Sequence, residues 1–441
     1  MQQDSLGLGL SGADPDAVGA YEAARRELQC YVGDPVASAE KAIAASPGFV
    51  MAHALRAWLY LLSTEAGAQP VARASWEAAL ALPADARERG HLAAIGQLLD
   101  GRWAAASRTL EDLAIEQPRD ALALQVGHLI DFYRGDARML RDRIARALPH
   151  WDATMPGYHA IVGMQAFGLE ECGDYAGAEA AGRRGVELER RDGWAQHAVA
   201  HVMEMQGRLD DGIAWMRADT AAWSEGSFFC VHNWWHLALY HLERGETDAA
   251  LDLFDGPIFG ARSTIVLDLL DASALLWRLH LRGVDVGGRW ADVADNWQAA
   301  DTAGLYAFND AHATMAFVGA GRGDAVAAVL AAQDRAMAGA GDNAAFTREV
   351  GQPLTLAIAA FGDGDWAGVL RLLRPLRSIA HRFGGSHAQR DVIDLTLIEA
   401  AIRGGARNLA EALAAERLAA KPASPLARLF ARRIAAMPRP G

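Results

Sequence analysis

The chain has 441 residues, of which 51% are hydrophobic, and it carries 42 Lys and Arg against 55 Asp and Glu. This apolar content can build a large core and excludes global disorder, while the net charge of −13 argues against nucleic-acid or anionic-membrane partners, since electrostatics would oppose both. Residues 1–16 do not resemble a signal peptide, no apolar run approaches the roughly 18 to 20 residues of a membrane span, and three cysteines without CxxC spacing argue against a disulfide framework, so we expect a cytoplasmic protein.

A glycine followed by a new amphipathic stretch recurs along the chain. It stands at Gly33, Gly67, Gly101, Gly135, Gly173, Gly207, Gly245, Gly283 and Gly321, with looser copies at Gly364 and Gly405. The first three intervals are 34 residues, and several later ones are 38. Four extra residues are about one helical turn, which keeps the same helix face inward. This period predicts tetratricopeptide-like repeats.

Each repeat predicts a pair of helices. The first helix precedes the glycine, as in residues 194–206, and the second follows it, as in residues 175–188. Small residues at fixed offsets from the glycine, such as Ala166, Ala178 and Gly212, indicate close contacts between helices. The predicted fold is therefore all-α, a right-handed superhelical solenoid of about ten to eleven tetratricopeptide-like hairpins.

The expected organisation is one continuous solenoid over residues 17–420, with an N-terminal extension at 1–16 and a C-terminal cap or tail at 421–441. A stacked array has no ordinary domain boundary, because each unit packs on its neighbours. The stretches Asp255 to Ser263 and Gly339 to Asn343 are the places where the stack is most readily bent or interrupted. Pro118 should stop a second helix.

The first helices of such units line a concave groove. Positions about 13, 10, 6 and 3 residues before each glycine should face it. Its middle, from Gly163 to Trp277, is rich in imidazoles, carboxylates and indoles. Ordinary tetratricopeptide grooves hold peptide tails with Lys, Arg and Asn. This groove has few cations at its centre, so we do not expect a peptide with a terminal carboxylate.

Two histidine pairs suggest a metal site in the groove. His197, His201 and Glu204 share one helix face because their spacings are four and three, and His232 and His236 are four apart on the next first helix. Pairs of imidazoles on adjacent helices are typical of metal sites in bundles. These donors suit one divalent ion, zinc, iron, nickel or manganese. His236 lies one position off the groove face, which weakens it as a ligand.

One alternative stands beside this interpretation. Buried histidines are usually hydrogen-bonded core residues, so the pairs could form a structural network. The HxxxHxxE spacing is not the HExxH of zinc proteases, so it predicts no protease chemistry.

Further candidates for the same pocket stand at helix starts and at groove positions. The expected ligand-binding residues besides the histidine pairs are His159, Trp235, Asp310, His312, His387 and Arg390, and Glu170 and Glu204 are the candidate catalytic carboxylates. Asp310 could instead be a helix cap. The Gly-Gly-Ser lead at 384–386 could bind an anion through backbone N–H groups with Arg390, but Ser386 is better explained as an N-cap.

Three motifs resemble those of the tetratricopeptide repeat protein 38 family. They are His-Ala-Val-Ala-His-Val-Met-Glu-Met-Gln-Gly-Arg (197–208), Cys-Val-His-Asn-Trp-Trp-His (230–236) and Gly-Gly-Ser-His-Ala-Gln-Arg-Asp (384–391). The resemblance extends from about residue 20 to about residue 430. It implies an all-helical superhelix in the cytoplasm and supplies no reaction.

Three functions follow from these patterns. The first is a binding protein that holds a small molecule or short peptide in the groove, with a metal ion as a candidate participant. The second is a metal-dependent hydrolase or oxidative enzyme using His197, His201, His232 and Glu204, with Glu170 or Glu204 as general base. The third is a protein-interaction scaffold with structural histidines. Formation of a homo-oligomer is compatible with each of these functions.

Overall fold

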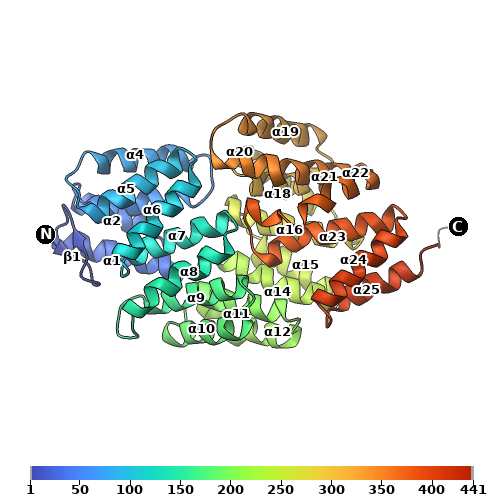
Figure 1. The fold of residues 1–441 in the computed structure, drawn as a ribbon, viewed down its shortest axis with the longest axis horizontal. Coiled ribbons are helices and arrows are strands. Elements are labelled where there is room, and N and C mark those ends of the chain that lie inside the picture. Colours follow the sequence, from blue (N-terminus) through green and yellow to red (C-terminus); the bar gives the residue numbers. More distant parts are fainter. Residues whose placement is uncertain (1, 439–441) are drawn as a thin grey trace. The chain divides into compact units, whose positions relative to one another are not determined.

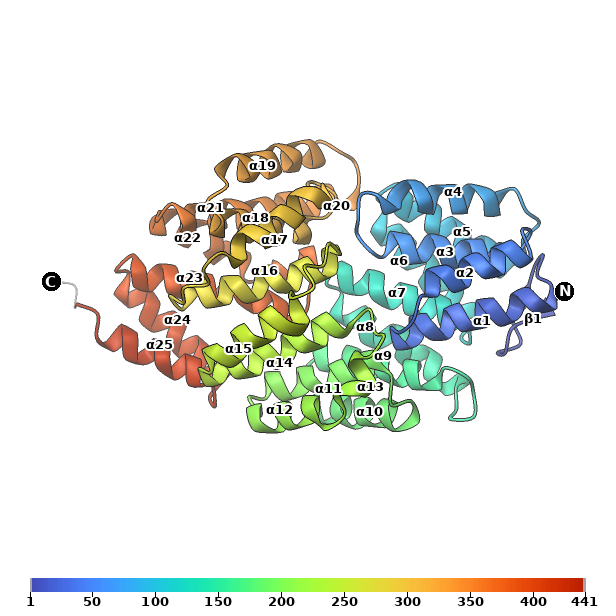
Figure 2. The same cartoon turned by 180° about the vertical axis from the view of Figure 1, so that it is seen from behind.

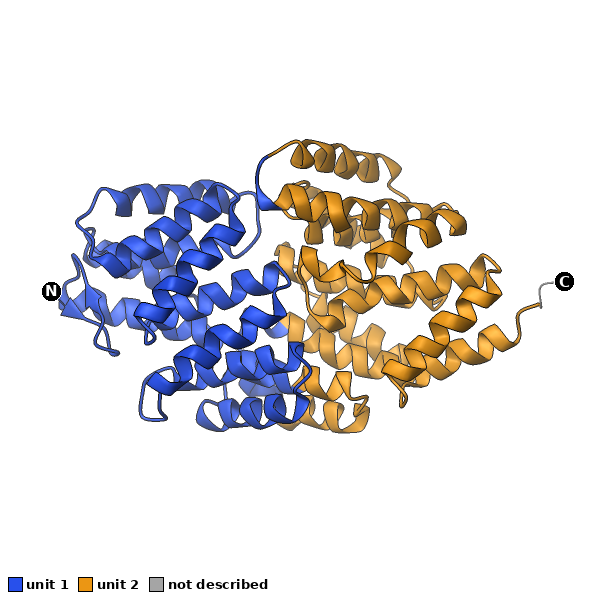
Figure 3. Ribbon diagram, in the orientation of Figure 1, with its two compact units in different colours: residues 1–199, 219–230, 340–342 blue, residues 200–218, 231–339, 343–441 orange. Residues whose placement is uncertain are grey.

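The computed structural model describes residues 2–438, which are helical apart from one short pair of strands (Figures 1 and 2). Strands β1 (Gln2–Gln3) and β2 (Gly9–Leu10) pair antiparallel near the N-terminus. The chain forms two compact units (Figure 3). Unit 1 comprises residues 1–199, 219–230 and 340–342, and unit 2 comprises residues 200–218, 231–339 and 343–441.

Unit 1 is a stack of antiparallel hairpins in which each helix packs on the next. Its helices are α1 (Pro15–Cys30), α2 (Pro35–Ala45), α3 (Val50–Leu61), α4 (Ala68–Leu80), α5 (Ala86–Leu99), α6 (Trp103–Glu116), α7 (Ala121–Tyr133), α8 (Ala137–Ala147), η1 (Leu148–His150), α9 (Tyr158–Glu171), α10 (Tyr175–Leu188), the first half of α11 (Gly193–Met205), and α13 (Thr220–Ser224). The end of α6 two residues before Pro118 confirms the predicted stop.

Unit 2 is a second stack of the same kind. It contains the rest of α11, then α12 (Leu209–Ala218), α14 (Cys230–Arg244), α15 (Thr247–Leu253), η2 (Phe254–Ile258), α16 (Val266–Leu281), α17 (Arg289–Ala300), α18 (Ala307–Gly319), α19 (Gly323–Met337), α20 (Asp342–Phe346), η3 (Thr347–Gly351), α21 (Gln352–Gly362), α22 (Trp366–Leu373), η4 (Arg374–Leu376), η5 (Ala380–Phe383), α23 (His387–Arg403), α24 (Arg407–Ala420) and α25 (Pro425–Ala435). The two stacks confirm the predicted all-α solenoid of tetratricopeptide-like hairpins.

The repeated glycine turns the chain between the two helices of a hairpin. All of the predicted glycines except Gly67 have a positive φ, between 64° and 84°. Glycine adopts this left-handed conformation without strain, and it commonly ends helices there. Gly67 has a φ of −64°. The left-handed position in that turn falls on Thr64 instead, at a φ of 56°.

Small residues sit where the helices of neighbouring hairpins approach most closely. Ala166 and Ala178 are completely buried, as predicted. A Cβ atom on Gly212 of α12 would lie 2.3 Å from the ring of Tyr240 in α14. Only glycine fits at this contact, which confirms the interpretation of that offset.

The two stretches expected to interrupt the array are both irregular. In η2 the chain leaves helical geometry at Gly256, next to Pro257. Residues 340–342, inside the second stretch, belong to unit 1, whereas the residues on either side of them belong to unit 2.

The inner face of unit 1 is occupied by α1 (Figure 2). Along its length this helix contacts successive first helices of the stack. The Tyr21 ring lies 5.2 Å from that of Phe49 in α3, and the Leu28 carbonyl accepts a 3.0 Å hydrogen bond from Gln125 in α7. At its end, Tyr31 stacks on Trp194 of α11, at 5.6 Å. Two predicted groove positions of unit 1, Gln125 and Trp194, therefore contact the protein's own N-terminal helix or the residue that follows it.

Across the described part of the chain, no helix is both long enough and apolar enough to cross a bilayer.

Candidate metal and ligand site

Three histidines of unit 2 meet where α11 and α14 lie side by side. The ring of His201 is 4.4 Å from that of His236, which in turn is 4.9 Å from that of His232. Each offers a ligand atom, and these atoms lie within 4.8 Å of one another. The expectation that His236 is poorly placed is wrong. One residue turns a helix by about 100°, and this turn directs His236 towards α11, the neighbouring first helix.

Two of these histidines are backed by carboxylates. Nδ1 of His232 lies 2.9 Å from Oδ2 of Asp271 in α16, and Nδ1 of His236 lies 3.0 Å from Oε2 of Glu204 in α11. An ionised carboxylate only accepts, so each imidazole must donate Nδ1–H, and its neutral form then carries the lone pair on Nε2. Carboxylates hold metal-ligating histidines in this way.

Burial also favours the neutral imidazoles. Burial and the neighbouring His236 lower the pKa of His201 well below its ordinary value. The pKa of His236 is lowered by burial, by His232 and by Arg278. Metal ligation requires the unprotonated ring, so these lowered pKa values keep His201 and His236 competent for coordination at neutral pH.

Trp235 contacts both the histidine cluster and a buried cation. Its indole stacks on His232, with ring centroids 5.3 Å apart and 18° between the planes. The guanidinium of Arg278 in α16 lies over the indole, at 5.2 Å from the ring centroid. Arg278 has an exposed fraction of 4%, so a buried cation lies against Trp235, one of the predicted groove residues.

Three of the predicted site residues lie in unit 1. The ring of His197 is on α11, one turn before His201, and packs against Phe167 and Trp194, at 5.4 and 5.1 Å. Glu170 is completely buried in α9, so the two candidate catalytic carboxylates, Glu170 and Glu204, belong to different units.

His159, also in unit 1, has partners of its own. Nδ1 of His159 lies 2.8 Å from Oδ2 of Asp192, and Nε2 lies 4.0 Å from Sγ of Cys30. Burial lowers the pKa of His159, but its hydrogen bonds to Asp192 and Cys30 outweigh burial and raise it to about 10. This imidazole is consequently charged at neutral pH and holds the end of α1 against α9.

The polar residues at the start of α18 are core residues. Tyr306 occupies the N-cap position of this helix, so the prediction that Asp310 caps it is wrong. Instead, Oδ1 of Asp310 accepts a 2.9 Å hydrogen bond from the Gly304 N–H, and burial raises the pKa of this carboxyl to about 7. His312 lies 2.9 Å from the Phe308 carbonyl oxygen through Nδ1, and burial lowers its pKa to about 4.

Ser386 caps α23, as predicted. Its side chain accepts from the Gln389 N–H, and the Gln389 side chain accepts from the Ser386 N–H. These N–H groups are thus engaged within the capping box. Arg390 donates to the carbonyl of Gly385, and His387 is exposed at the first turn of the helix.

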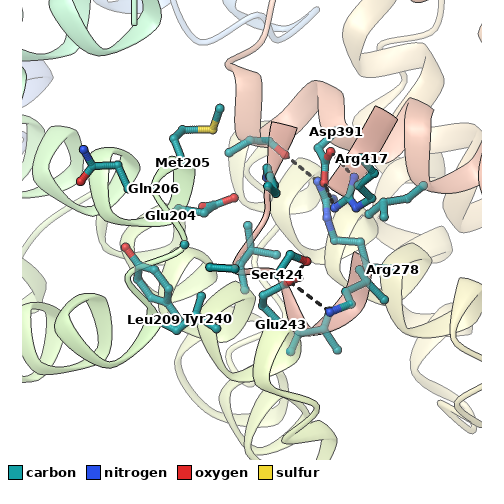
Figure 4. A pocket seen from close by; sticks show the side chains of 18 of the residues that line it. Glu204, Met205, Gln206, Leu209, Tyr240, Glu243, Arg278, Asp391, Arg417 and Ser424 are labelled. Atoms are coloured by element: carbon teal, nitrogen blue, oxygen red, sulfur yellow. Dashed lines mark hydrogen bonds and ion pairs between the residues drawn. The ribbon is translucent and has the colours of Figure 1, made fainter. Parts of the chain in front are cut away.

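A cavity of about 60 Å³ opens in unit 2 at the C-terminal ends of α11, α14 and α16 (Figure 4). Helix α23 and the corner between α24 and α25 close its other side. Its polar lining consists of Glu204, Gln206, Tyr240, Glu243, Arg278, Arg282, Asp391, Arg417, Lys421 and Ser424. Glu204 thus connects the histidine cluster to this cavity.

Several functional groups were missed from the sequence. Asp271 and Arg278 are seven residues apart, which places both on one face of α16. That spacing could have indicated a second polar face beside the histidine cluster. Asp391 forms a two-pronged ion pair with Arg417, at 2.8 and 3.0 Å. No local pattern marks this pair, because its members come from different helices.

Comparison with known proteins adds little beyond the fold. No protein-family model matches the sequence. Among solved structures, the chain is similar to a human IFIT1 dimer with m7Gppp-AAAA, at 13% identity and a TM-score of 0.43, over 96% of this chain and 95% of that one. It is also similar to the TPR domain of P58(IPK), at 13% identity and a TM-score of 0.22, over 88% and 98%. Likenesses this distant carry no argument about function.

Proposed function

We propose that this protein is a ligand-binding solenoid whose unit 2 holds one divalent metal ion through His201, His232 and His236, with a small molecule bound beside it. The observation that carries the proposal is the cluster itself, in which ligand atoms of three imidazoles lie within 4.8 Å of one another. The carboxylates of Asp271 and Glu204 support it, because they fix two of the rings by hydrogen bonds to Nδ1.

The donor set bears on the choice of ion. Imidazole ligands suit zinc, iron and nickel, and a carboxylate ligand beside them also suits manganese. Zinc is the first ion to test, because three histidines are a common ligand set for it. His197, predicted as a fourth ligand, belongs to unit 1, and the proposed site consists of the three histidines of unit 2. The likeness of the motifs around these histidines to the tetratricopeptide repeat protein 38 family, and a cytoplasmic location, are part of the proposal.

The test is metal binding by protein purified without a histidine tag and freed of metal by chelation. We expect about one equivalent of zinc, measured by calorimetry and by elemental analysis after dialysis. Changing His236 to Ala should weaken binding by 100-fold or more while the helical circular dichroism persists. His150→Ala, which removes an exposed imidazole of unit 1, is the matched control and should bind like the wild type.

The opposite result would assign the histidines a structural role. If the wild-type protein takes up no zinc, nickel, iron or manganese, and its melting temperature does not change with any of them, the metal site is refuted. The protein would then be a metal-free binder or an interaction scaffold.

A metal-dependent hydrolase or oxidative enzyme is the second candidate. The position of Glu204 favours it, because this carboxylate accepts from His236 and also lines the cavity. It could therefore take a proton from a group bound in that space. Turnover that requires the metal and is lost in Glu204→Gln, with metal affinity reduced much less, would distinguish an enzyme from a binder.

A further inference from the structure

The cavity of unit 2 holds an excess of positive charge. Four cationic side chains and three carboxylates line it. Each carboxylate already has a partner close by. Asp391 is paired with Arg417, Glu204 accepts from His236, and Glu243 accepts from the Ser424 hydroxyl and the Leu426 N–H.

Arg278 is the most deeply buried of these four cations. Its guanidinium donates to the carbonyls of Ala274 and Ala388, at 3.2 and 2.7 Å, and lies over the indole of Trp235. Among residues 2–438, no carboxylate oxygen lies within 4.0 Å of it. Neutral carbonyls and an indole solvate a guanidinium without neutralising it, and burial lowers the pKa of this group. A buried cation of this kind is costly unless an anion compensates it.

A second arginine flanks the same space. Arg282, the C-cap residue directly after α16, donates to the carbonyl of Leu242, and a carboxylate oxygen of Glu243 lies 4.0 Å from it. Burial lowers the pKa of Arg282 to about 10. Two guanidiniums therefore line the space, and among the described residues the one carboxylate within 4.0 Å of either is Glu243, at 4.0 Å from Arg282.

The size of the cavity fits a small group. A single water needs about 10–15 Å³ measured in this way, so about 60 Å³ accommodates the three or four oxygens of an oxyanion. Guanidinium groups bind carboxylates and phosphates through paired N–H donors.

We infer that this cavity is an oxyanion-binding site, in which Arg278 with Arg282 receives the phosphate or carboxylate group of a small molecule. It deepens the proposed function by naming the ligand's chemical class, since Glu204 borders both this space and the histidine cluster. It does not require the metal.

The experiment uses the full-length protein freed of metal by chelation, so that its outcome is independent of the metal proposal. Melting temperature is measured in inorganic phosphate, methyl phosphate, acetate and chloride at equal ionic strength. We expect one of the oxyanions to raise the melting temperature above its value in chloride, because a ligand that binds only the folded state stabilises it. A response to inorganic phosphate alone indicates a free ion, and a larger response to methyl phosphate or acetate indicates the end of an organic molecule.

Arg278→Met should abolish this response, while Arg335→Met, which removes an exposed arginine of the same unit, should keep it. The charge-preserving Arg278→Lys loses the paired donors and should raise the Kd at least tenfold. If Arg278→Met does not fold, the comparison of Arg278→Lys with the wild type still decides the question. The inference is overturned if the wild type melts at the same temperature in all four salts, or if Arg278→Lys responds to the oxyanion as strongly as the wild type.

Discussion

The buried carboxyl of Asp310 makes the stability of the protein depend on pH in a direction opposite to that of most aspartates. Burial raises its pKa from 3.8 to about 7, so the folded protein retains a proton that the unfolded chain has already lost. The stability associated with this group is fully present below pH 3.8 and is lost as pH rises to about 7. Asp310→Asn removes the titration and still presents an acceptor to Gly304 and a donor in place of the acid O–H.

The magnitude follows from the same pKa. At about 1.4 kcal/mol per pKa unit, the full effect above pH 7 is about 4 kcal/mol, of which about 2–3 kcal/mol develops between pH 5 and pH 8. We therefore expect Asp310→Asn to gain about 2–3 kcal/mol in unfolding free energy relative to the wild type over that interval, and nothing further above pH 8. The pH-dependent contributions of titratable groups that both proteins share cancel in this difference.

Urea unfolding at pH 5, 7 and 8, followed by circular dichroism, measures the difference. Asp324→Asn is the control, since Asp324 is exposed in the first turn of α19. Its effect should be small and nearly independent of pH. A difference between Asp310→Asn and the wild type that stays constant from pH 5 to pH 8, or that falls, would refute the assignment of a buried, protonated carboxyl.

Three further predictions concern packing and the two histidine sites. A Cβ on Gly168 would lie 2.6 Å from a backbone carbonyl oxygen of α8, so Gly168→Ala should cost about 1–3 kcal/mol by denaturant titration, whereas Gly323→Ala, which meets no atom within 4 Å, should be neutral or stabilising by up to about 1 kcal/mol. In Asp192→Asn the pKa of His159 should fall from about 10 to 6.5 or lower in an NMR titration, and an unchanged titration would contradict the ion pair. If the metal proposal holds, Asp271→Asn should weaken zinc binding about 10–100-fold, a loss that calorimetry resolves and that a purely structural aspartate would not produce.

The repeat and the histidine spacing were predictable because both are local. A turn glycine is required by the sign of φ at one position, and Gly101 or Gly245 shows that requirement directly in the sequence. The pairs His201 with Glu204 and His232 with His236 follow from helical periodicity, which places residues three and four apart on one face. Such signals need no knowledge of which helices become neighbours.

The rest depends on contacts between distant segments. Cys30 and His159 are 129 positions apart, and their meeting follows from α1 lying on the inner face of unit 1. Arg278 was missed for the same reason, because the carbonyl of Ala388 that holds it is 110 positions away. Asp310 was misassigned because a carboxylate near a helix start is usually a cap, and only the structure shows that α18 starts three residues earlier.

The placement of α1 has a consequence for any peptide that would seek the inner face of unit 1. The helix is tethered to the face it covers, so it acts as an intramolecular competitor whose effective concentration is on the order of millimolar. An external peptide must therefore displace a tethered helix before it can contact this face, which raises its apparent Kd. Under the proposed function this favours unit 2 as the place of ligand binding, because the space lined by Arg278 requires no such displacement.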